Sequence, residues 1–400
     1  MSRFFCLSVL LSSVVALAAA DEYNYDESKV PDYTLPDPLV MENGKKVEIT
    51  AAWKVRRDEI LGLFEEHVYG KAPLGRPEKM RFVEGKKYED FLGGKATLQE
   101  IRILLFGDEK GPHLDLLVIA PREIPEGGVP AFVALNFSGN HSIHPDKRIT
   151  ITDSWMRASG EDKKEGRVVD NKAQEKSRGF KEHRWAVEKI IDAGMALATF
   201  YYGDFDDGFE NGIHTVTGKP AQNEWGSIGS WAWGCSRALD YLETNEAIDS
   251  KRVGVFGHSR LGKTALWAGA TDQRFALTIS NNSGCGGAAL SRRHFGETVQ
   301  RINSSFPHWF CDNFEKYNEN EAELPVDQHQ LISLIAPRPV YIASAEGDEW
   351  ADPRGEFLSA LHADPVYRLT GTDGLAGAKE YPSVDSPVGG TIRYHVRTGK

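Results

Sequence analysis

The sequence predicts an α/β fold in which helices sandwich a mostly parallel, doubly wound β-sheet. Two observations support this prediction. Short apolar runs typical of buried strands alternate with helical patterns through the second half of the chain. In addition, residues 252–256 form a β-branched strand that passes through the turn Gly257–Gly262 into the Ala- and Leu-rich helix 263–270.

The other elements follow from hydrophobic periodicity and turn residues. An apolar spacing of three to four residues predicts an amphipathic helix over 53–69. Turns rich in Gly, Pro and Glu separate the early strands, so this part of the sheet should contain hairpins. Residues 21–43 should form an extended arm over the surface. Residues 149–180 are long for an unstructured loop and should form an excursion near the entrance of the functional site. The remaining expected strands are 98–106, 114–120, 131–137, 195–202, 275–280, 339–345 and 391–396, and the remaining helices are 181–193 and most of 225–248.

The composition excludes some partners. The chain has 400 residues, of which 40% are hydrophobic and 26% charged, as in ordinary globular proteins. This length allows two domains, but α/β folds of this size often form one, so residues 21–400 are expected to build a single domain. The formal net charge is −11 and no long basic run is present, so nucleic acid is not expected as a partner.

Residues 1–20 have the features of a secretory signal. Arg3 supplies the positive charge, residues 4–17 are apolar, and Ala18–Ala20 are small residues before the expected cleavage site. An uncleaved membrane anchor is the alternative, although the apolar run is short for a span. No later run is long and apolar enough to cross a bilayer. The mature protein is therefore expected to be secreted or periplasmic, without a membrane span.

The cysteines leave two alternatives open. Cys6 leaves with the signal, and Cys235, Cys285 and Cys311 remain. In an oxidising compartment we expect a Cys285–Cys311 disulfide, because both residues lie in loop-like sequence. A set of buried thiols is the alternative. No Cys/His spacing typical of a metal site occurs, and neither a metal nor an organic cofactor is expected.

The turn between strand 252–256 and helix 263–270 contains a candidate nucleophile, Ser259. A Ser flanked by Gly at a sharp strand-to-helix turn is the nucleophile elbow of α/β-hydrolases, and the crowded turn requires small neighbours. The backbone N–H after the Ser can help to bind an oxyanion. The usual G-x-S-x-G pattern is broken by Leu261, with Gly262 one residue later. A structural turn serine is the alternative.

Two further sequences resemble hydrolase motifs. Residues 136–141 follow a strand at the place where α/β-hydrolases donate a second oxyanion N–H, so residues 138–140 are candidates, with a plain turn as the equal alternative. His141 and His144, near this loop, are expected at the surface. Gly234-Cys-Ser-Arg237 looks like a second serine motif, but Ser236 has helical spacing and no strand before it, so we interpret it as a helix residue.

A serine nucleophile requires an imidazole to take its proton and a carboxylate to orient that imidazole. In this fold the chain order is Ser, acid, His. Asp348 follows strand 339–345 and is the expected acid. Glu346, Glu349 and Asp352 compete for this role, and a solvated acidic turn is the alternative. The base should follow the last strand, but His395 lies inside the strand expected there. The histidines after Ser259 are His294, His308, His329, His362 and His395.

Four segments resemble the glucuronoyl esterases of carbohydrate esterase family 15, in their bacterial form. The resemblance covers most of the mature chain and is strongest from Trp225 onward. The G-x-S-R-x-G-K elbow is more specific than a generic hydrolase serine, and it accounts for Leu261. The segments are Gly257-His-Ser-Arg-Leu-Gly-Lys263, Asn282-Ser-Gly-Cys-Gly-Gly287, Arg301-Ile-Asn-Ser-Ser-Phe-Pro-His-Trp-Phe310 and Ala345-Glu-Gly-Asp-Glu-Trp-Ala-Asp-Pro-Arg-Gly-Glu356.

The resemblance implies an α/β-hydrolase that cleaves the ester between 4-O-methyl-glucuronic acid of xylan and lignin alcohols. It implies Ser259 as the nucleophile and Arg260 as the group that stabilises the oxyanion. Independently of the resemblance, a fixed guanidinium stabilises a negative charge that develops beside it. Lys263 and Trp350 match residues that hold the uronate sugar, and Glu297 matches a further sugar contact. For Arg260, a surface ion pair is the alternative. Without the resemblance, Lys263 would be interpreted as a helix surface residue and Trp350 as a packed residue.

Two departures from the family pattern affect the triad. Many fungal relatives carry the acid where this chain has Asn282, and an amide cannot carry the charge that stabilises imidazolium. The acid role therefore shifts to Asp348, as in some bacterial relatives. The family's catalytic His tends to follow the segment resembling 394–400, so we expect a domain truncated before its general base. His395 can substitute only if the last strand ends earlier than predicted.

Two rival functions remain. An acetylxylan esterase would use the same nucleophile with a different pocket. A catalytically inactive carbohydrate-binding protein would bind xylan without turnover. The leading expectation is a secreted serine esterase that acts on glucuronoxylan or lignin–carbohydrate esters.

Overall fold

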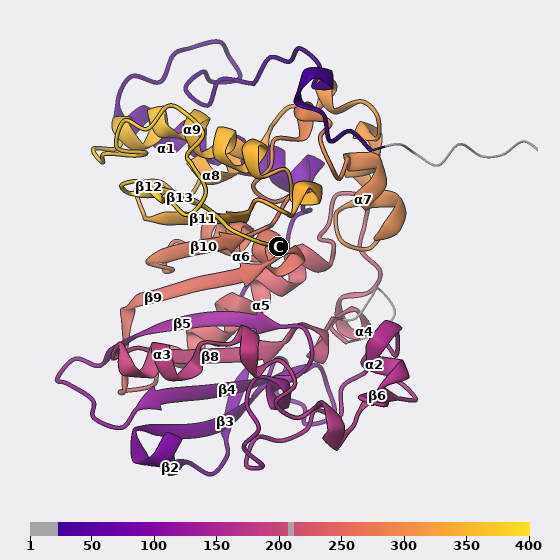
Figure 1. Cartoon of the computed structure of the whole chain (residues 1–400), viewed down its shortest axis with the longest axis vertical. Helices are drawn as coiled ribbons and strands as arrows, with labels where there is room; N and C mark the ends of the chain where they lie inside the picture. The colour runs from indigo at the N-terminus through magenta and orange to yellow at the C-terminus, as the bar shows by residue number, and fades with distance from the viewer. Residues whose placement is uncertain (1–22, 207–211) are drawn as a thin grey trace, which may run out of the picture.

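The computed structural model describes residues 23–206 and 212–400. These residues build an eleven-stranded sheet in the order β1-β3-β4-β8-β5-β9-β10-β11-β13-β12, with β2 paired to β3 (Figure 1). The strands are β1 Arg81–Glu84, β2 Tyr88–Phe91, β3 Ala96–Leu104, β4 His113–Pro121, β5 Val129–Asn136, β8 Ala196–Tyr201, β9 Ile248–His258, β10 Leu277–Asn281, β11 Val340–Ala345, β12 Val388–Gly389 and β13 Ile392–Arg397. A separate pair joins β6 Val168–Val169 to β7 Lys172–Ala173.

The sheet is parallel in its centre and antiparallel at its start. Strands β8, β5, β9, β10, β11 and β13 pair in parallel, whereas β1, β3, β4 and β8 pair antiparallel in that order. Short Gly- and Pro-containing connections suit hairpins, and helical connections are needed for parallel neighbours. The predicted fold class is therefore confirmed.

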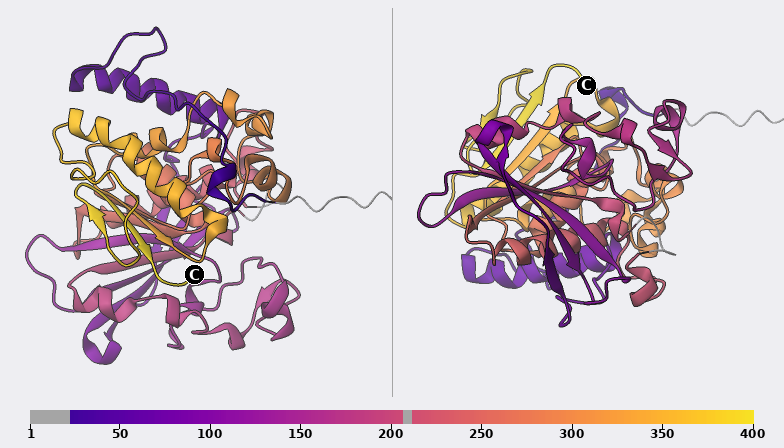
Figure 2. Two further views of the ribbon diagram at one scale, coloured as in Figure 1. Left: turned by 45° about the horizontal axis from the view of Figure 1, so that its top comes forward. Right: turned by 90° about the horizontal axis from the view of Figure 1, so that it is seen from below.

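Helices cover the two faces of the sheet unequally. The larger core lies under α1 Thr50–His67, α5 Ser227–Leu242, α6 Arg260–Thr271, α8 Gln328–Ser333 and α9 Pro353–Leu369. α1 and α9 lie on the same side of the sheet (Figure 2). A smaller core on the other face lies under α3 Val187–Asp192. The short helices α2 Gly160–Lys164, α4 His214–Thr217 and α7 Val299–Ser305 lie in the connections.

One expected helix is largely absent. Within 181–193, the chain forms a 3-10 turn at Glu182–Arg184, an extended residue at Trp185 and only then α3. The extended backbone at Trp185 interrupts the helical path, and the Trp185 ring lies 6.0 Å from the ring of Phe256 on β9. Residues 1–20 lie outside the described residues, as does the expected signal. In the described residues, no helix combines the length and apolarity that a membrane crossing needs.

The expected disulfide is wrong. Cys235, Cys285 and Cys311 are free, and all three are buried. The Cys311 thiol contacts the carbonyl of Glu66 at the end of α1, at 3.8 Å, rather than Cys285. Burial raises the pKa of Cys285 well above its ordinary value and that of Cys311 to about 12. The alternative of a buried thiol set is therefore the correct one.

Candidate active site

Ser259 lies at a strained turn between β9 and α6. Its backbone adopts φ 57° and ψ −129°, a conformation that non-glycine residues rarely adopt, and the residue is exposed. A Cβ on Gly257 would lie 1.9 Å from the Leu261 carbonyl oxygen, so only glycine fits there. A Cβ on Gly262 would lie 3.1 Å from the Ser283 side chain. The geometry has the features of a nucleophile elbow with its second glycine displaced by one residue.

The turn also prepares an oxyanion site. The Ser259 N–H donates to the Asn281 carbonyl at 2.9 Å, which anchors the turn to β10. The Ser259 carbonyl accepts from Gly262 and Lys263 at 2.8 and 3.1 Å. The N–H groups of the next residues therefore belong to the first turn of α6, where backbone donors have no helical acceptor and favour negative charge.

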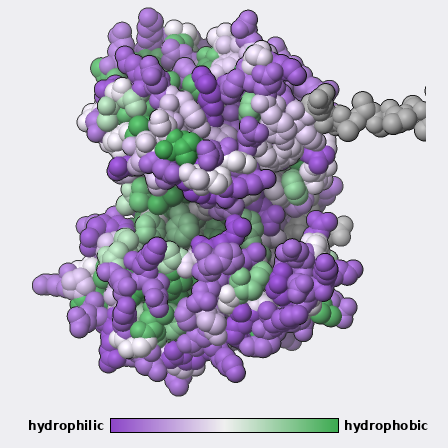
Figure 3. All heavy atoms as spheres, in the orientation of Figure 1, coloured by the Kyte–Doolittle hydropathy of each residue, from purple (hydrophilic) through white to green (hydrophobic). Residues whose placement is uncertain are grey.

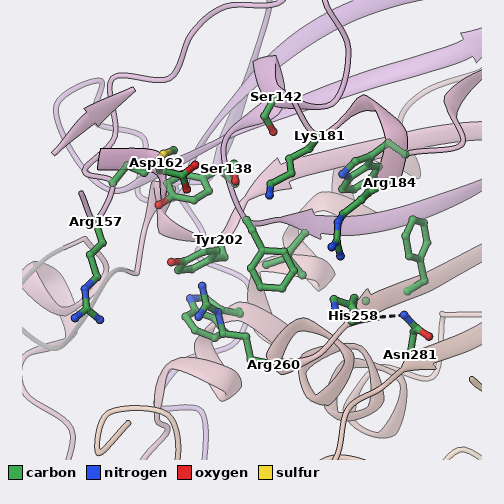
Figure 4. Close-up of a pocket in the computed structure, with 18 of the residues that line it drawn as sticks. Ser138, Ser142, Arg157, Asp162, Lys181, Arg184, Tyr202, His258, Arg260 and Asn281 are labelled. Carbon is green, nitrogen blue, oxygen red and sulfur yellow. Dashed lines mark hydrogen bonds between the residues drawn. The ribbon is translucent and has the colours of Figure 1, made fainter. Parts of the chain in front are cut away.

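The Arg260 guanidinium lies among aromatic rings beside this turn (Figure 4). It lies 4.5 Å from the ring centre of Tyr202 and 5.0 Å from that of Phe137. Trp309 and Trp231 follow at 5.5 and 6.0 Å. The Nε atom is buried without a hydrogen-bond partner in the described part of the chain. The rings hold a planar cation in one orientation through cation–π attraction and leave N–H donors available for an anion.

A cavity of about 1060 Å³ opens in front of Arg260. Its cationic lining consists of Arg157, Lys181, Arg184, Arg260 and Arg397. The cavity continues over the sheet face of β9 and β10, where Phe256 and Ile279 line it. The space-filling view shows this hollow with apolar side chains at its floor (Figure 3). A protein with a net charge of −11 thus concentrates positive charge at one cleft.

Asp348 follows β11 as predicted, and an amide orients it. The Asn282 Nδ2 donates to Asp348 Oδ2 at 2.6 Å, while the Asn282 Oδ1 accepts from Arg397 Nη1 at 3.0 Å. Because one neighbour is an acceptor and the other a donor, the amide can adopt only one orientation. Arg397 also donates to the Asn281 side chain at 3.1 Å. Asn282 therefore orients Asp348, the candidate acid.

The competing acids have other partners. Asp352 is buried, pairs with Arg293 at 2.8 Å and caps α9 through the Gly355 N–H at 2.9 Å. Glu346 accepts from the Gly399 N–H at 3.4 Å, and Glu349 is exposed. Asp348 is thus the carboxylate of this group that reaches the loop after β10.

His395 does not reach the elbow. It lies in β13 opposite Ala343, with its Nδ1 3.2 Å from the Tyr341 hydroxyl and its Nε2 3.9 Å from Asp385. β13 continues to Arg397, so the condition for His395 to act, an earlier end of the strand, is not met. His308 is the histidine after Ser259 that lines the cavity with Arg260.

The three expected sugar contacts lie close to one another. Lys263 Nζ donates to the Ser283 carbonyl and lies 3.8 Å from Glu297 Oε2, with both side chains less than a tenth exposed. Burial raises the pKa of Glu297, and the neighbouring Lys263 opposes this rise. The Glu297 N–H donates to the Trp350 carbonyl at 3.1 Å. These residues form a compact group next to the elbow.

The loop after β5 is tied down by side chains. Asn140 accepts from the Asn136 amide at 2.7 Å and donates to the Asp115 carbonyl at 2.7 Å, and Ser138 lines the cavity. His141 is buried rather than at the surface. Its Nε2 lies 2.7 Å from the Ser177 hydroxyl, so it fastens the 149–180 excursion to this loop. Burial lowers the pKa of His141 to about 4, which keeps the ring neutral.

Sequence reasoning missed several supporting residues. Glu356 is fully buried and accepts from the N–H groups of Ser283 and Gly284 at 2.7 and 2.9 Å. Arg397, the residue after the expected strand 391–396, was assigned no role. Glu356 ends the segment 345–356 that resembles the family, but nothing in the sequence marks its burial or the pairing of Arg397 with Asn282. Across the ranges described, no group of three or more His, Cys, Asp or Glu residues is arranged to hold a metal ion.

Comparisons with known proteins agree with this geometry. The family model described as "Glucuronyl esterase, fungi" matches residues 214–371. A relative named carbohydrate esterase MZ0003, from an unknown prokaryotic organism, is 54% identical over 387 residues, 94% of this chain and 88% of the relative. A 4-O-methyl-glucuronoyl methylesterase from Wolfiporia cocos is 38% identical over 369 residues, covering 86% of this chain and 74% of the relative.

Solved structures give the same result. A structure described as a promiscuous CE15 esterase from the marine bacterial metagenome has a TM-score of 0.88 and 52% identity, covering 95% of both chains. The glucuronoyl esterase from Solibacter usitatus has a TM-score of 0.85 and 44% identity, covering 93% of this chain and 94% of that one. With this degree of identity over nearly its whole described length, and with the G-x-S-R-x-G-K elbow folded as a nucleophile turn, the chain belongs to carbohydrate esterase family 15, the glucuronoyl esterases.

Proposed function

We propose that the protein hydrolyses the ester between 4-O-methyl-glucuronic acid of glucuronoxylan and lignin alcohols. The proposal rests on one arrangement of side chains around Ser259. The exposed Ser259 stands at a strained elbow, directly followed by Arg260 in an aromatic cage, with the group of Lys263, Glu297 and Trp350 beside it. The names of family relatives that act on 4-O-methyl-glucuronoyl esters support the same substrate class.

In the proposed reaction, Ser259 Oγ attacks the uronate carbonyl while its proton passes to a general base. The oxyanion that forms accepts hydrogen bonds from the first turn of α6 and from the Arg260 guanidinium. The C–O bond to the alcohol then breaks, and the alcohol leaves with a proton. A water molecule cleaves the resulting acyl-enzyme, so that glucuronate is released and Ser259 regains its hydrogen. Asp348, oriented by Asn282, is the acid that steadies the protonated base.

The sugar of the substrate is assigned to the group formed by Lys263, Glu297 and Trp350. Lys263 and Glu297 offer a donor and an acceptor, a combination that matches sugar hydroxyls, and Trp350 offers an apolar ring for a pyranose face. The alcohol side is assigned to the cavity in front of Arg260. We also propose that residues 1–20 direct the chain to secretion or the periplasm, where plant cell-wall xylan and lignin are accessible.

The test is hydrolysis of benzyl glucuronate by the wild-type chain and by Ser259→Ala. We expect Ser259→Ala to lower kcat by at least about 1000-fold, because no other hydroxyl occupies the elbow. Ser236→Ala is the matched control, since this serine of a similar motif is buried within α5 and should leave the rate unchanged. Measurable hydrolysis at equal rates by wild-type and Ser259→Ala would refute the assignment.

A second substrate should be compared, because one similar structure is described as promiscuous. Acetylated xylan assayed beside benzyl glucuronate measures which ester the pocket prefers. A higher kcat/KM on acetyl-xylan, still abolished by Ser259→Ala, would favour an acetylxylan esterase.

A further inference from the structure

The first described residues of the chain lie against Trp350. The Tyr23 ring lies 4.8 Å from the Trp350 ring at an interplanar angle of 81°, an edge-to-face contact. On another side, the Arg301 guanidinium lies 5.7 Å from the Tyr23 ring. Tyr23 is thus held between an aromatic ring and a cation, which lie 327 and 278 residues further along the sequence. Figure 1 shows this indigo N-terminal segment beside the orange loops next to α7.

The segment that carries Tyr23 is fastened by contacts independent of that ring. The Gly296 N–H donates to the Asn24 carbonyl at 2.9 Å. Glu27 accepts from Arg293 Nη2 at 2.6 Å, and Arg293 in turn pairs with the buried Asp352. These bonds to well-buried partners give the segment a defined position on the protein surface.

Trp350 contacts both this segment and Glu297, another candidate sugar contact. A Cβ on Gly296 would lie 2.6 Å from the carbonyl oxygens of Glu349 and Trp350, so the chain at Gly296 runs closely over the Trp350 backbone. The next residue, Glu297, donates its N–H to the Trp350 carbonyl and pairs with Lys263. Residues 296–297 therefore contact both the N-terminal segment and the turn Glu349–Ala351.

We propose that Tyr23 is a positioning residue for the sugar site, which it serves by holding the Trp350 ring in its binding orientation. Trp350 stands on a three-residue 3-10 turn and is only partly buried. A large side chain on such a turn loses rotamer freedom when a ligand orders it, and this loss weakens binding. An edge-to-face partner that orders the ring before the ligand binds reduces this entropy cost of binding. The proposal rests on the proposed function, because it takes Trp350 as a sugar contact.

The test measures binding separately from catalysis. In the Ser259→Ala background, methyl 4-O-methyl-glucuronate is titrated by calorimetry so that the ligand is not consumed. We expect Tyr23→Ala to weaken binding about fivefold, the typical effect of an aromatic pair, without a change in the thermal unfolding midpoint. Tyr23→Phe should retain the affinity. Tyr25→Ala is the matched control, because it removes the same ring from the same segment at a contact with Phe295 rather than Trp350.

The ester-hydrolysing chain gives an independent measurement. In it, Tyr23→Ala should raise KM about fivefold and leave kcat unchanged, since Tyr23 touches no reacting atom. Unchanged affinity in Tyr23→Ala, a loss as large in Tyr25→Ala, or a loss in Tyr23→Phe equal to that in Tyr23→Ala would each overturn the inference while the proposed function stands. Absence of binding in Ser259→Ala with Tyr23 intact would overturn both.

Discussion

The buried carboxylate of Glu356 should make the stability of this protein depend on pH. Glu356 lies on α9 and supports the loop after β10. Its Oε1 accepts from the Ser283 N–H, the Ser283 hydroxyl and the Gly284 N–H at 2.7, 3.1 and 2.9 Å, and its Oε2 accepts from Ser344. Burial raises the pKa of Glu356 to about 7, although these donors favour the ionised form.

The direction of the effect follows from proton binding. With a raised pKa, the folded chain binds this proton more tightly than the unfolded chain, whose ordinary glutamate pKa is 4.5. The contribution of Glu356 to the free energy of unfolding is thus fully present below pH 4.5 and is lost as the pH rises through about 7. The difference between the two pKa values corresponds to about 3 kcal/mol.

Glu356→Gln is the perturbation that isolates this contribution. Its amide oxygen can accept the three bonds now made to Oε1, its NH₂ group can donate to Ser344, and it does not titrate. Urea unfolding from pH 4.5 to pH 8 measures the free energy of both proteins. We expect the wild-type value to fall by about 3 kcal/mol relative to Glu356→Gln over this range. Glu126→Gln, on an exposed loop, is the control and should follow the wild-type curve.

A difference between wild-type and Glu356→Gln that stays constant with pH would refute the reasoning, because it would mean that Glu356 titrates alike in the folded and unfolded chains. A difference that grows in favour of the wild-type chain as the pH rises would show that the donors outweigh burial.

Three further predictions concern the elbow and the thiols. Arg260→Met should lower kcat for benzyl glucuronate about 100-fold with little change in KM, as expected when one oxyanion donor is lost, and a change confined to KM would contradict the role. Gly257→Ala should destabilise the fold by several kcal/mol in urea unfolding, because its Cβ would lie 1.9 Å from the Leu261 carbonyl, whereas Gly62→Ala, with no atom within 4 Å and inside α1, should stabilise it by about 1 kcal/mol. After removal of residues 1–20, a thiol reagent should label no cysteine in the native protein and three in the denatured protein, and one labelled thiol would instead indicate a disulfide.

The local sequence determined the elements and the elbow. Strands with β-branched residues, helices with apolar spacing and the glycines around Ser259 depend on neighbours a few residues away, and such patterns can be interpreted directly. The predicted strands and the predicted helices 53–69 and 263–270 lie within a few residues of their observed bounds, but α9, one of the longest helices, was not predicted. Among the predicted helices, 181–193 is the exception, because it is interrupted at the extended residue Trp185, whose ring packs toward Phe256 of the sheet.

Part of the candidate site could also be predicted, because some of its residues are neighbours in the sequence. Ser259, Arg260 and Lys263 belong to one short motif, and Asp348 follows a recognisable strand. The contacts that orient them join segments distant in the sequence. Asn282 meets Asp348 and Arg397, and Glu297 meets Lys263, only because parallel strands bring their carboxyl ends to one edge of the sheet.

By itself, the sequence determined the fold class, the nucleophile turn and the family. The tertiary structure decided the state of the thiols, the burial of His141, the direction in which His395 faces and the contact of Tyr23 with Trp350. The physical reason is that hydrogen-bonding periodicity and backbone strain act within a few residues. Burial, charge pairing and side-chain packing, in contrast, depend on which distant segments the completed sheet brings together.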